Sequence, residues 1–525
     1  MGDVWDVVVI GTGFGGSLAA LPAVEAGLRV LLLERGRWVD RDDSAWDARQ
    51  ILVDRKYRSA SPYHKQTRLG RSTMYPDEAV GGKSVFYGAA SMRFREQDFD
   101  LPSQLGTGAG AAPAWPIRYA DLAPFYDDAE QRLGVAGVAG VDPTEPPRGC
   151  GYAHAPPAYS EPAQRVALAA TTLGLRPFPL PLAINYGNDG GRQSCVQCMT
   201  CDLFPCKISA KNDLAVTVIP QAQRSGAEVL HSTIVARLGR RHDTITEVEC
   251  LDVQSGKRFV VRCRVCIVSA GAIGSAALLL ASGLGNQGSS GALVGRYLMR
   301  HCSGIVIGLF PFETNVARRF HKQVGITDFY LGHAEERPRG PWGMIQGLQT
   351  PPPEFIVAEG GFPIGVLGAR TVRRHIYLIC IGQDLPQGAN RVELDPGRQD
   401  VYGLPVPLIH HRYAKHDLAV RRALYRQAGR ILRAAGAVIR LRKPINTFSH
   451  VVGTCRFGAD PETSVLDSWC RFHGMRNLFV VDGSFMPTSG GVNPSLTIAA
   501  NGLRVGRHIV ANWDRLAGAV GAAAG

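Results

Sequence analysis

A glycine-rich loop between an apolar strand and a small-residue helix constrains this chain more than any other feature. Residues 6–10 read DVVVI, a β-branched run typical of a buried parallel strand. The next six residues, GTGFGG, place Gly11, Gly13 and Gly16 in G-x-G-x-x-G spacing. Gly11 allows a tight turn, Gly13 lets the backbone approach a pyrophosphate, and Gly16 lets the following helix pack closely on the strand. The loop therefore predicts a Rossmann-type unit that binds a dinucleotide.

A carboxylate follows the second predicted strand of this unit. Residues 30–33 read VLLL, and Glu34 ends that strand. It stands about 20 residues past the glycines, where a carboxylate can bind a ribose hydroxyl. The same charge repels a 2′-phosphate, so NADP is not expected here. The glycines and Glu34 together do not distinguish FAD from NAD.

Length and composition limit the location and the partners. The 525 residues allow about two to four domains of roughly 150 residues each. No apolar run reaches the roughly 18–20 residues that a membrane span needs, and the N-terminus enters a strand without a signal peptide. We therefore expect a cytoplasmic protein with no membrane span. The net charge of +13 could attract nucleic acid, but the sequence has no Lys/Arg block and no zinc-finger or RNP signature, so no nucleic-acid partner is expected.

Three further motifs are spaced along the rest of the chain. Residues 271–285 read GAIGSAALLLASGLG, residues 450–454 read HVVGT, and residues 493–498 read NPSLTI. Together with the N-terminal loop, they resemble the glucose-methanol-choline (GMC) family of flavin oxidoreductases nearly end to end. One departure from the family pattern is Ala276, where a proline or serine is usual.

The resemblance implies an α/β fold with two interleaved domains. One is a Rossmann-type FAD-binding domain, and the other is an α+β substrate domain built on an antiparallel sheet. We predict that the FAD-binding domain comprises residues 1–98, 195–302 and 450–525. The substrate domain is predicted to comprise residues 99–194 and 303–449.

The resemblance also implies oxidation of an alcohol, with His450 as the catalytic base and Asn493 as its partner. The flavin accepts a hydride while the imidazole removes the hydroxyl proton. An imidazole with a pKa near neutrality suits this proton step. An amide beside it can orient the same oxygen without competing for its proton.

The cofactor implied by the resemblance is FAD. Some members of the family carry a histidine at the position of Phe86 that bonds covalently to FAD, and because phenylalanine cannot do so, we expect non-covalent FAD. The residues predicted to hold it are Gly11, Gly13, Gly16, Glu34, Arg35, Gly82, Ser84, Val235, Gly271 and Asp482.

Four cysteines form a C-x2-C-x2-C-x4-C cluster at Cys195, Cys198, Cys201 and Cys206. The first three resemble ferredoxin spacing, and thiolates at such spacing can also hold zinc. A few sugar dehydrogenases of the family carry an iron–sulfur cluster in this general region. An iron–sulfur cluster, zinc, a disulfide and reduced structural thiols all stay open at this point.

The sequence leaves the substrate and the electron acceptor open. The segments VFYG (85–88), PLAIN (181–185) and GSFMP (483–487) look most like a branch of the family that oxidises aminoglycoside alcohols, whereas the cysteine segment looks like sterol-oxidising relatives. We expect a small-molecule alcohol, either sugar-like, cyclitol- or aminoglycoside-like, or sterol-like, and oxygen or another acceptor. The alternatives are a dehydrogenase that passes electrons through an iron–sulfur cluster, a non-redox flavin lyase, and a binding protein with vestigial FAD. The presence of both His450 and Asn493 argues against the last.

Overall fold

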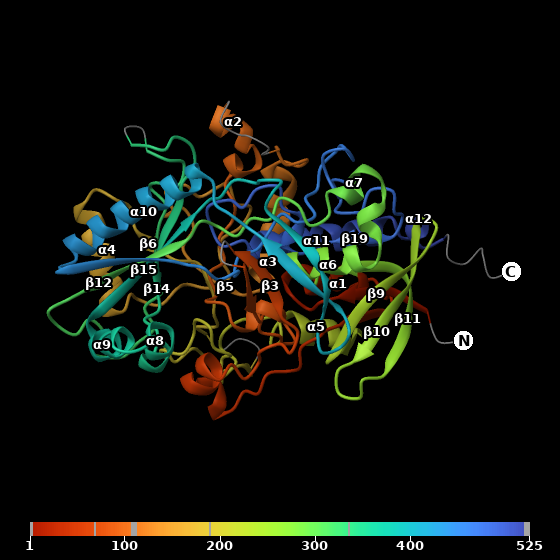
Figure 1. The fold of residues 1–525 in the computed structure, drawn as a ribbon. Coiled ribbons are helices and arrows are strands. Elements are labelled where there is room, and N and C mark those ends of the chain that lie inside the picture. Colours follow the sequence, from red (N-terminus) through yellow and green to blue (C-terminus); the bar gives the residue numbers. More distant parts are fainter. Residues whose placement is uncertain (1–3, 68–69, 107–112, 188–190, 334–335, 519–525) are drawn as a thin grey trace.

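Two large sheets organise the fold and lie on opposite sides of the view in Figure 1. The structure is a computed structural model and describes residues 4–67, 70–106, 113–187, 191–333 and 336–518. Strands β9, β10 and β11 lie on the side of the two termini, and β12, β14 and β15 lie on the other side (Figure 1). The first sheet belongs to the predicted dinucleotide-binding unit, and the second is the predicted antiparallel sheet.

The first sheet has seven strands within the described residues and a parallel centre. Its order is β8-β2-β1-β11-β10-β9, and β19 pairs with the end of β11. β1 runs parallel to both β2 and β11, and the inner residues of all three strands are buried, as expected for a sheet covered on both faces. The Rossmann-type prediction is therefore confirmed. The strands are β1 (Val4–Ile10), β2 (Val30–Leu33), β8 (Glu228–Leu230), β9 (Thr233–Arg241), β10 (Thr244–Asp252), β11 (Arg258–Val268) and β19 (Leu478–Val480).

Helix α1 (Phe14–Glu25) packs against α11 (Ser495–Ala511) at very short range. A Cβ atom on Gly502 would lie 2.7 Å from the Gly15 carbonyl oxygen, and one on Gly506 would lie 2.5 Å from the Ala19 carbonyl oxygen. The two backbones therefore touch along one turn of α11, which only glycine permits. Because Asn493 stands just before α11, this contact fixes the predicted partner of His450 relative to the glycine-rich loop.

The second sheet has six strands within the described residues, all antiparallel. Its order is β18-β12-β15-β14-β13-β6. Helices α10 (Lys415–Ala434) and α4 (Glu161–Thr172) pack on it through a separate apolar core, which includes Val306, Leu378 and Leu424. The strands are β6 (Phe178–Pro179), β12 (Gly304–Leu309), β13 (Val324–Ile326), β14 (Gly343–Leu348), β15 (His375–Gly382) and β18 (Ile439–Pro444).

A four-stranded sheet joins segments that the sequence analysis placed in different domains. β16 (Arg391–Gln399) and β17 (Pro405–His410) pair with β3 (Tyr63–Thr67) and β4 (Gly70–Met74) in the order β16-β17-β3-β4. This sheet joins the two predicted domains through backbone pairing. The exact domain limits stay a prediction.

The remaining elements connect these sheets. Within the described ranges, no helix combines the length and the apolar character needed to cross a bilayer. The other elements are β5 (Val135–Ala136), β7 (Leu182–Ala183), α2 (Leu101–Leu105), α3 (Tyr119–Arg132), α5 (Val218–Arg224), α6 (Gly271–Ala281), α7 (Gly288–Ala292), α8 (Pro353–Gly360), α9 (Ile364–Thr371) and α12 (Trp513–Ala517).

The α1–α11 contact predicts opposite effects for two glycine substitutions. Gly506→Ala should lower the free energy of unfolding by about 1–3 kcal/mol, because the new methyl group overpacks against backbone. Gly429→Ala in α10 should raise it by about 0.5–1 kcal/mol, because its Cβ would meet nothing within 4 Å and alanine favours a helix. Urea unfolding of both variants measures the difference. Equal effects would contradict the close contact.

Candidate active site

The glycine-rich loop has the geometry that its spacing predicts. Gly11 has φ +98°, and a Cβ atom there would clash with the Ser269 carbonyl oxygen at the end of β11. A Cβ atom on Gly16 would clash with the Gly11 carbonyl oxygen, so the first turn of α1 packs directly on the loop. A Cβ atom on Gly13 would instead meet nothing within 4 Å. The open face of the loop is thus at Gly13, where a pyrophosphate is expected.

A second glycine segment forms the opposite wall of this cradle. Gly82 has φ +56°, and a Cβ atom there would lie 3.1 Å from the Gly13 Cα atom. Ser84 is fully buried and donates to the Gly81 carbonyl oxygen at 2.6 Å, while it accepts from the Leu214 amide at 3.0 Å. Its hydroxyl therefore holds the segment in place, and a direct bond from Ser84 to a cofactor stays a prediction.

Glu34 lies beside the loop and is held by residue 12, which the sequence analysis missed. The Thr12 amide and hydroxyl donate to Glu34 Oε2 at 3.0 and 2.6 Å, and the Gly36 amide donates to Oε1 at 2.9 Å. Burial raises the pKa of the carboxyl, and these hydrogen bonds oppose that shift. Arg35 pairs with Glu78 at 2.6 Å. The loop and the predicted ribose-binding carboxylate are therefore one hydrogen-bonded unit.

Two of the predicted cofactor residues join the ends of neighbouring strands. Asp482 follows β19 and accepts from the Gly271 amide at 3.0 Å and from the Ser275 hydroxyl. The first turn of α6 is thereby tied to the end of β19. Val235 lies in β9, which begins at Thr233, and the Thr233 amide donates to the Glu34 carbonyl oxygen at 2.9 Å. Gly271 and Asp482 thus lie at strand ends near the glycine-rich loop, and Val235 lies in the strand that contacts Glu34, while the contacts of all the predicted residues to a cofactor stay predictions.

The cradle fits a dinucleotide. The N-terminal end of α1 carries no side-chain cap, so its backbone N–H groups face the open side at Gly13. The Ser269 hydroxyl, at the end of β11 beside Gly11 and Gly16, is buried and has no hydrogen-bond partner among the described residues. A phosphate group can use such donors.

The structure brings His450 and Asn493 together beside this cradle. Asn493 Nδ2 lies 3.4 Å from His450 Nε2. The loop that carries His450 is anchored four residues later, where the Thr454 hydroxyl donates to the Ala272 carbonyl oxygen at 2.6 Å. Because Ala272 is in the first turn of α6, the pair and the cofactor cradle share one wall.

A second histidine, His301, contacts His450, and no sequence signal identified it. His301 precedes β12, and its Nδ1 atom lies 3.0 Å from His450 Nδ1. The two rings are perpendicular, at 88° and with centroids 5.1 Å apart. Most of the His450 surface is buried, and His301 is only 1% exposed.

The environment of His450 corrects one expectation. We expected an imidazole pKa near neutrality, but burial lowers it to about 3, and the nearby His301 and Lys322 contribute to the shift. A positive charge on His450 would face these groups in a site with little water. The ring is therefore neutral over the physiological pH range.

Polar side chains from the second sheet and from the cysteine segment lie near His450 and Asn493. Gln346 in β14 is 1% exposed, and its Nε2 atom lies 3.4 Å from Asn493 Oδ1, while its Oε1 atom has no hydrogen-bond partner among the described residues. Lys322, whose charge acts on His450, donates to Asp202 at 2.9 Å. Gly88 touches this ion pair, and a Cβ atom there would clash with it. This side of the site is therefore polar.

The four clustered cysteines line one cavity of about 20 Å³, which has room for about one water molecule. None of them is in a disulfide, and burial raises the pKa of Cys195 to about 11. The described residues contain no set of three or more histidine, cysteine, aspartate or glutamate side chains arranged to hold a metal ion. Lys211 instead braces the segment, since its ammonium donates to the carbonyl oxygens of Tyr87, Cys201 and Phe204. A metal at Cys195, Cys198, Cys201 and Cys206 stays a prediction.

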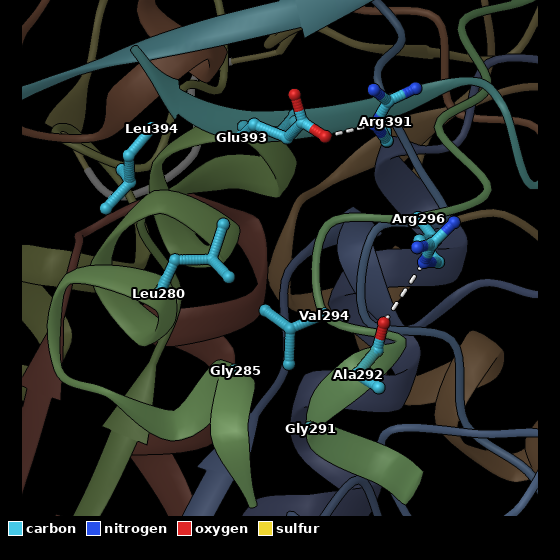
Figure 2. A pocket seen from close by; sticks show the side chains of 10 residues that line it. Leu280, Gly285, Gly291, Ala292, Val294, Arg296, Arg391, Glu393 and Leu394 are labelled. Atoms are coloured by element: carbon cyan, nitrogen blue, oxygen red, sulfur yellow. Dashed lines mark hydrogen bonds and ion pairs between the residues drawn. The ribbon is translucent and has the colours of Figure 1, made fainter. Parts of the chain in front are cut away.

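A larger cavity, of about 320 Å³, lies among α6, α7 and β16 (Figure 2). Arg296 and Arg391 lie on one side of it, and Leu280 and Val294 supply apolar surface. Each guanidinium is already engaged, Arg296 with the Ala292 carbonyl oxygen and Arg391 with Glu393. None of the residues that line this cavity was predicted as a site residue.

Comparison with known proteins gives a consistent result. Models of the GMC oxidoreductase family match residues 8–303 and 386–502. The chain is 35% identical to 6'''-hydroxyparomomycin C oxidase of Streptomyces lividus, over 97% of this chain and 92% of that protein. It is 36% identical to paromamine 6'-oxidase of Streptomyces fradiae, over 96% and 91%. The solved structure of pyridoxine 4-oxidase from Mesorbium loti has a similar fold, with a TM-score of 0.63 at 19% identity and coverage of 97% of this chain and 99% of that chain.

The lowered pKa of His450 predicts that its ring does not titrate between pH 8 and pH 5. Because the folded protein disfavours the charged ring, His450 binds a second ring proton only well below the ordinary value of 6.5. Histidine NMR across this pH range measures the effect, with the His450 signals assigned by their loss in His450→Gln. A titration midpoint near pH 6.5 would contradict it.

Proposed function

This chain belongs to the GMC oxidoreductase family, and on that premise we propose that it oxidises an alcohol group of an aminoglycoside-like sugar with FAD as cofactor and dioxygen as electron acceptor. The alcohol loses a hydride from carbon and a proton from oxygen and becomes a carbonyl. Dioxygen takes up both electrons and two protons as hydrogen peroxide. The observation that carries the proposal is the contact of His450 with Asn493 beside the cofactor cradle.

The residues of this chain divide the work of the proposed reaction. Bound FAD supplies the hydride acceptor. His450 Nε2 takes the hydroxyl proton, and its neutral ring is the form that can do so. The Asn493 amide, 3.4 Å from the same nitrogen, donates to the alcohol oxygen and holds it near the base. Two groups thus converge on one oxygen atom.

We propose that FAD is bound without a covalent bond. Phe86 is buried directly after the glycine segment that faces the cradle, and its ring packs near Tyr57 with centroids 5.8 Å apart. It offers no nucleophilic atom. The Tyr87 hydroxyl donates to the Asn212 carbonyl oxygen at 2.9 Å, so its polar end is already engaged. Denaturation should therefore release the flavin.

The polar wall opposite His450 supports a hydroxyl-rich substrate rather than a sterol. Gln346 offers an unpartnered carbonyl oxygen, and Lys322 and Asp202 form a charged pair nearby. A sterol would leave the Gln346 carbonyl oxygen without a partner and would place apolar surface against the charged pair, which costs free energy. A sugar can satisfy them. The substrates named for the two curated relatives are also of the aminoglycoside type.

Two alternatives from the sequence remain distinguishable by experiment. A dehydrogenase that uses an iron–sulfur cluster at the cysteines would show broad cluster absorption and would form no hydrogen peroxide. A flavin lyase of the same family would not bleach when substrate is added without oxygen. The small cavity among the cysteines and the oxidase relatives favour the oxidase.

Replacement of the base predicts a specific kinetic loss. His450→Gln should retain FAD, yet its anaerobic flavin reduction by a paromamine-type aminoglycoside should slow by about 10²–10⁴-fold, because no base removes the proton. Stopped-flow absorbance measures the rate. His508→Gln is the matched control, since His508 stacks on Trp469 at the far end of α11 and should react like wild type. Wild-type rates in His450→Gln would overturn the role of the base, and a wild type that no alcohol bleaches would overturn the oxidase.

Replacement of Gln346 should change the substrate preference. Gln346→Leu keeps the size of the side chain but removes its hydrogen bonds, so KM for the aminoglycoside should rise about 10-fold, as expected from the loss of roughly 1.4 kcal/mol. A simple alcohol with a single hydroxyl is the control: it reports only the loss of the contact between Gln346 and Asn493, so its KM should rise less than that of the aminoglycoside. Steady-state kinetics with both substrates measure the ratio. An unchanged ratio would show that Gln346 does not contact the sugar.

A further inference from the structure

A row of hydrogen bonds runs from a backbone carbonyl to the catalytic pair. His301 Nε2 lies 2.8 Å from the Ser489 carbonyl oxygen, and His301 Nδ1 lies 3.0 Å from His450 Nδ1. His450 Nε2, on the other side of that ring, faces Asn493 Nδ2 at 3.4 Å. Both histidine rings thus use both of their nitrogens.

The carbonyl oxygen at one end of this row determines which nitrogen of each histidine ring carries a hydrogen. A carbonyl oxygen only accepts, so His301 Nε2 must carry a hydrogen. His301 is buried and its pKa is lowered, so the ring is neutral and its Nδ1 atom has a lone pair. That lone pair requires the hydrogen of His450 to sit on Nδ1. The His450 Nε2 atom is then left with a lone pair that points toward Asn493.

We infer that His301 is a positioning residue that holds His450 in the Nδ1–H tautomer, so that His450 Nε2 is free to take the proton of the alcohol. The inference rests on the proposed function for its catalytic meaning, but the tautomer itself follows from the contacts. With the opposite tautomer, His450 Nε2 would carry a hydrogen and would face the alcohol as a donor, which cannot act as a base.

The backbone around the two histidines is built to keep this row in register. Met299 and Val452 pair as an isolated β-bridge, with both N–H···O distances 3.0 Å. The bridge places the residue that lies two positions after Met299 beside the one that lies two positions before Val452. His301 and His450 are therefore brought together although 149 residues separate them in the chain.

Asp384 fixes the other end of the row. Its carboxylate accepts from the backbone amides of Arg300 and His301 at 2.9 and 3.0 Å. The Asp384 amide in turn donates to the Ser489 hydroxyl at 3.2 Å. One residue thus holds both His301 and the chain segment that supplies the accepting carbonyl, which leaves the His301 ring little freedom to turn.

The test compares two substitutions of His301 that differ in one atom's role. In His301→Asn, the amide oxygen can take the place of Nδ1 and accept from His450 Nδ1–H. In His301→Ala, nothing accepts that hydrogen. Tyr413→Phe is the structural control. The Tyr413 hydroxyl donates to the His301 carbonyl oxygen at 2.8 Å but, in the described contacts, does not touch the ring of His301 or of His450.

The first readout is the tautomer of His450 in the purified full-length flavoprotein. Nitrogen NMR of histidine-labelled protein, assigned with His450→Gln, should find the hydrogen of His450 on Nδ1 in wild type, His301→Asn and Tyr413→Phe. It should find a different or mixed tautomer in His301→Ala. A hydrogen on His450 Nε2 in the wild type would overturn the inference, whatever the variants do.

The second readout is the anaerobic rate of flavin reduction, together with the dissociation constant of the sugar. His301→Ala should slow reduction by about 10²-fold or more with little change in sugar binding, because only the base is misdirected. His301→Asn and Tyr413→Phe should each stay within about 10-fold of wild type, less than the loss of a general base. If His301→Asn keeps the tautomer but is as slow as His301→Ala, then His301 does more than position His450, and the inference is wrong.

These readouts separate the inference from the proposed function. If no alcohol reduces the flavin but the wild-type tautomer is the expected one and is lost in His301→Ala, the proposed oxidation fails and the role of His301 as a positioning residue for the His450 ring stands. If alcohols are oxidised but His301→Ala retains both the tautomer and the rate, the proposed oxidation stands and the role of His301 fails. Flavin content and the urea midpoint of each variant show that it is folded.

Discussion

Contact between backbones at α1 is the constraint on which the rest of this structure depends. Gly16 packs on the Gly11 carbonyl oxygen, Gly15 packs on the end of β19, and Gly502 packs on Gly15. The loop, the strand that ends at Asp482 and the helix that follows Asn493 are therefore locked at van der Waals distance. A methyl group at any of these glycines would push one element away from the others. These backbone contacts therefore set the distance between the cofactor cradle and the proposed catalytic pair.

The glycine-rich loop and the proposed catalytic pair could be named from the sequence because their signals are local. Gly11, Gly13 and Gly16 have their roles within six residues, and each role depends on the backbone alone. His450 and Asn493 could be named because each lies in a short motif. The residues that complete the site carry no such signal. Gln346 and His301 meet the pair only through β14 and the bridge at Met299, and neither contact can be read from neighbouring residues.

The pKa of His450 could not be predicted from the sequence for the same reason. The motif identifies the side chain but not what surrounds it. Burial and the nearby Lys322 arise from chain segments far away in sequence, and together with His301 they lower the pKa to about 3 instead of leaving it near neutrality. In the same way, the sequence does not decide between a metal site, a disulfide and reduced thiols at Cys195 and its neighbours. The structure places these cysteines around a cavity that has room for about one water molecule.

The low pKa of His450 keeps the ring in the neutral form that can accept a proton but also makes it a weaker base, so the proposed reaction needs stabilisation of charge on the substrate. An alcohol that gives up its proton gains negative charge on oxygen. Burial, the largest cause of the low pKa, disfavours charge of either sign, whereas the positive charge of Lys322 favours an anion at that point. Lys322 contributes to both effects, since it repels a charged imidazole and attracts an alkoxide. Asp202 holds Lys322 in place at 2.9 Å, and Gly88 leaves the space that this ion pair occupies. In the proposed reaction, the same polar side chains would bind a sugar and would stabilise the charge that forms when the proton is removed.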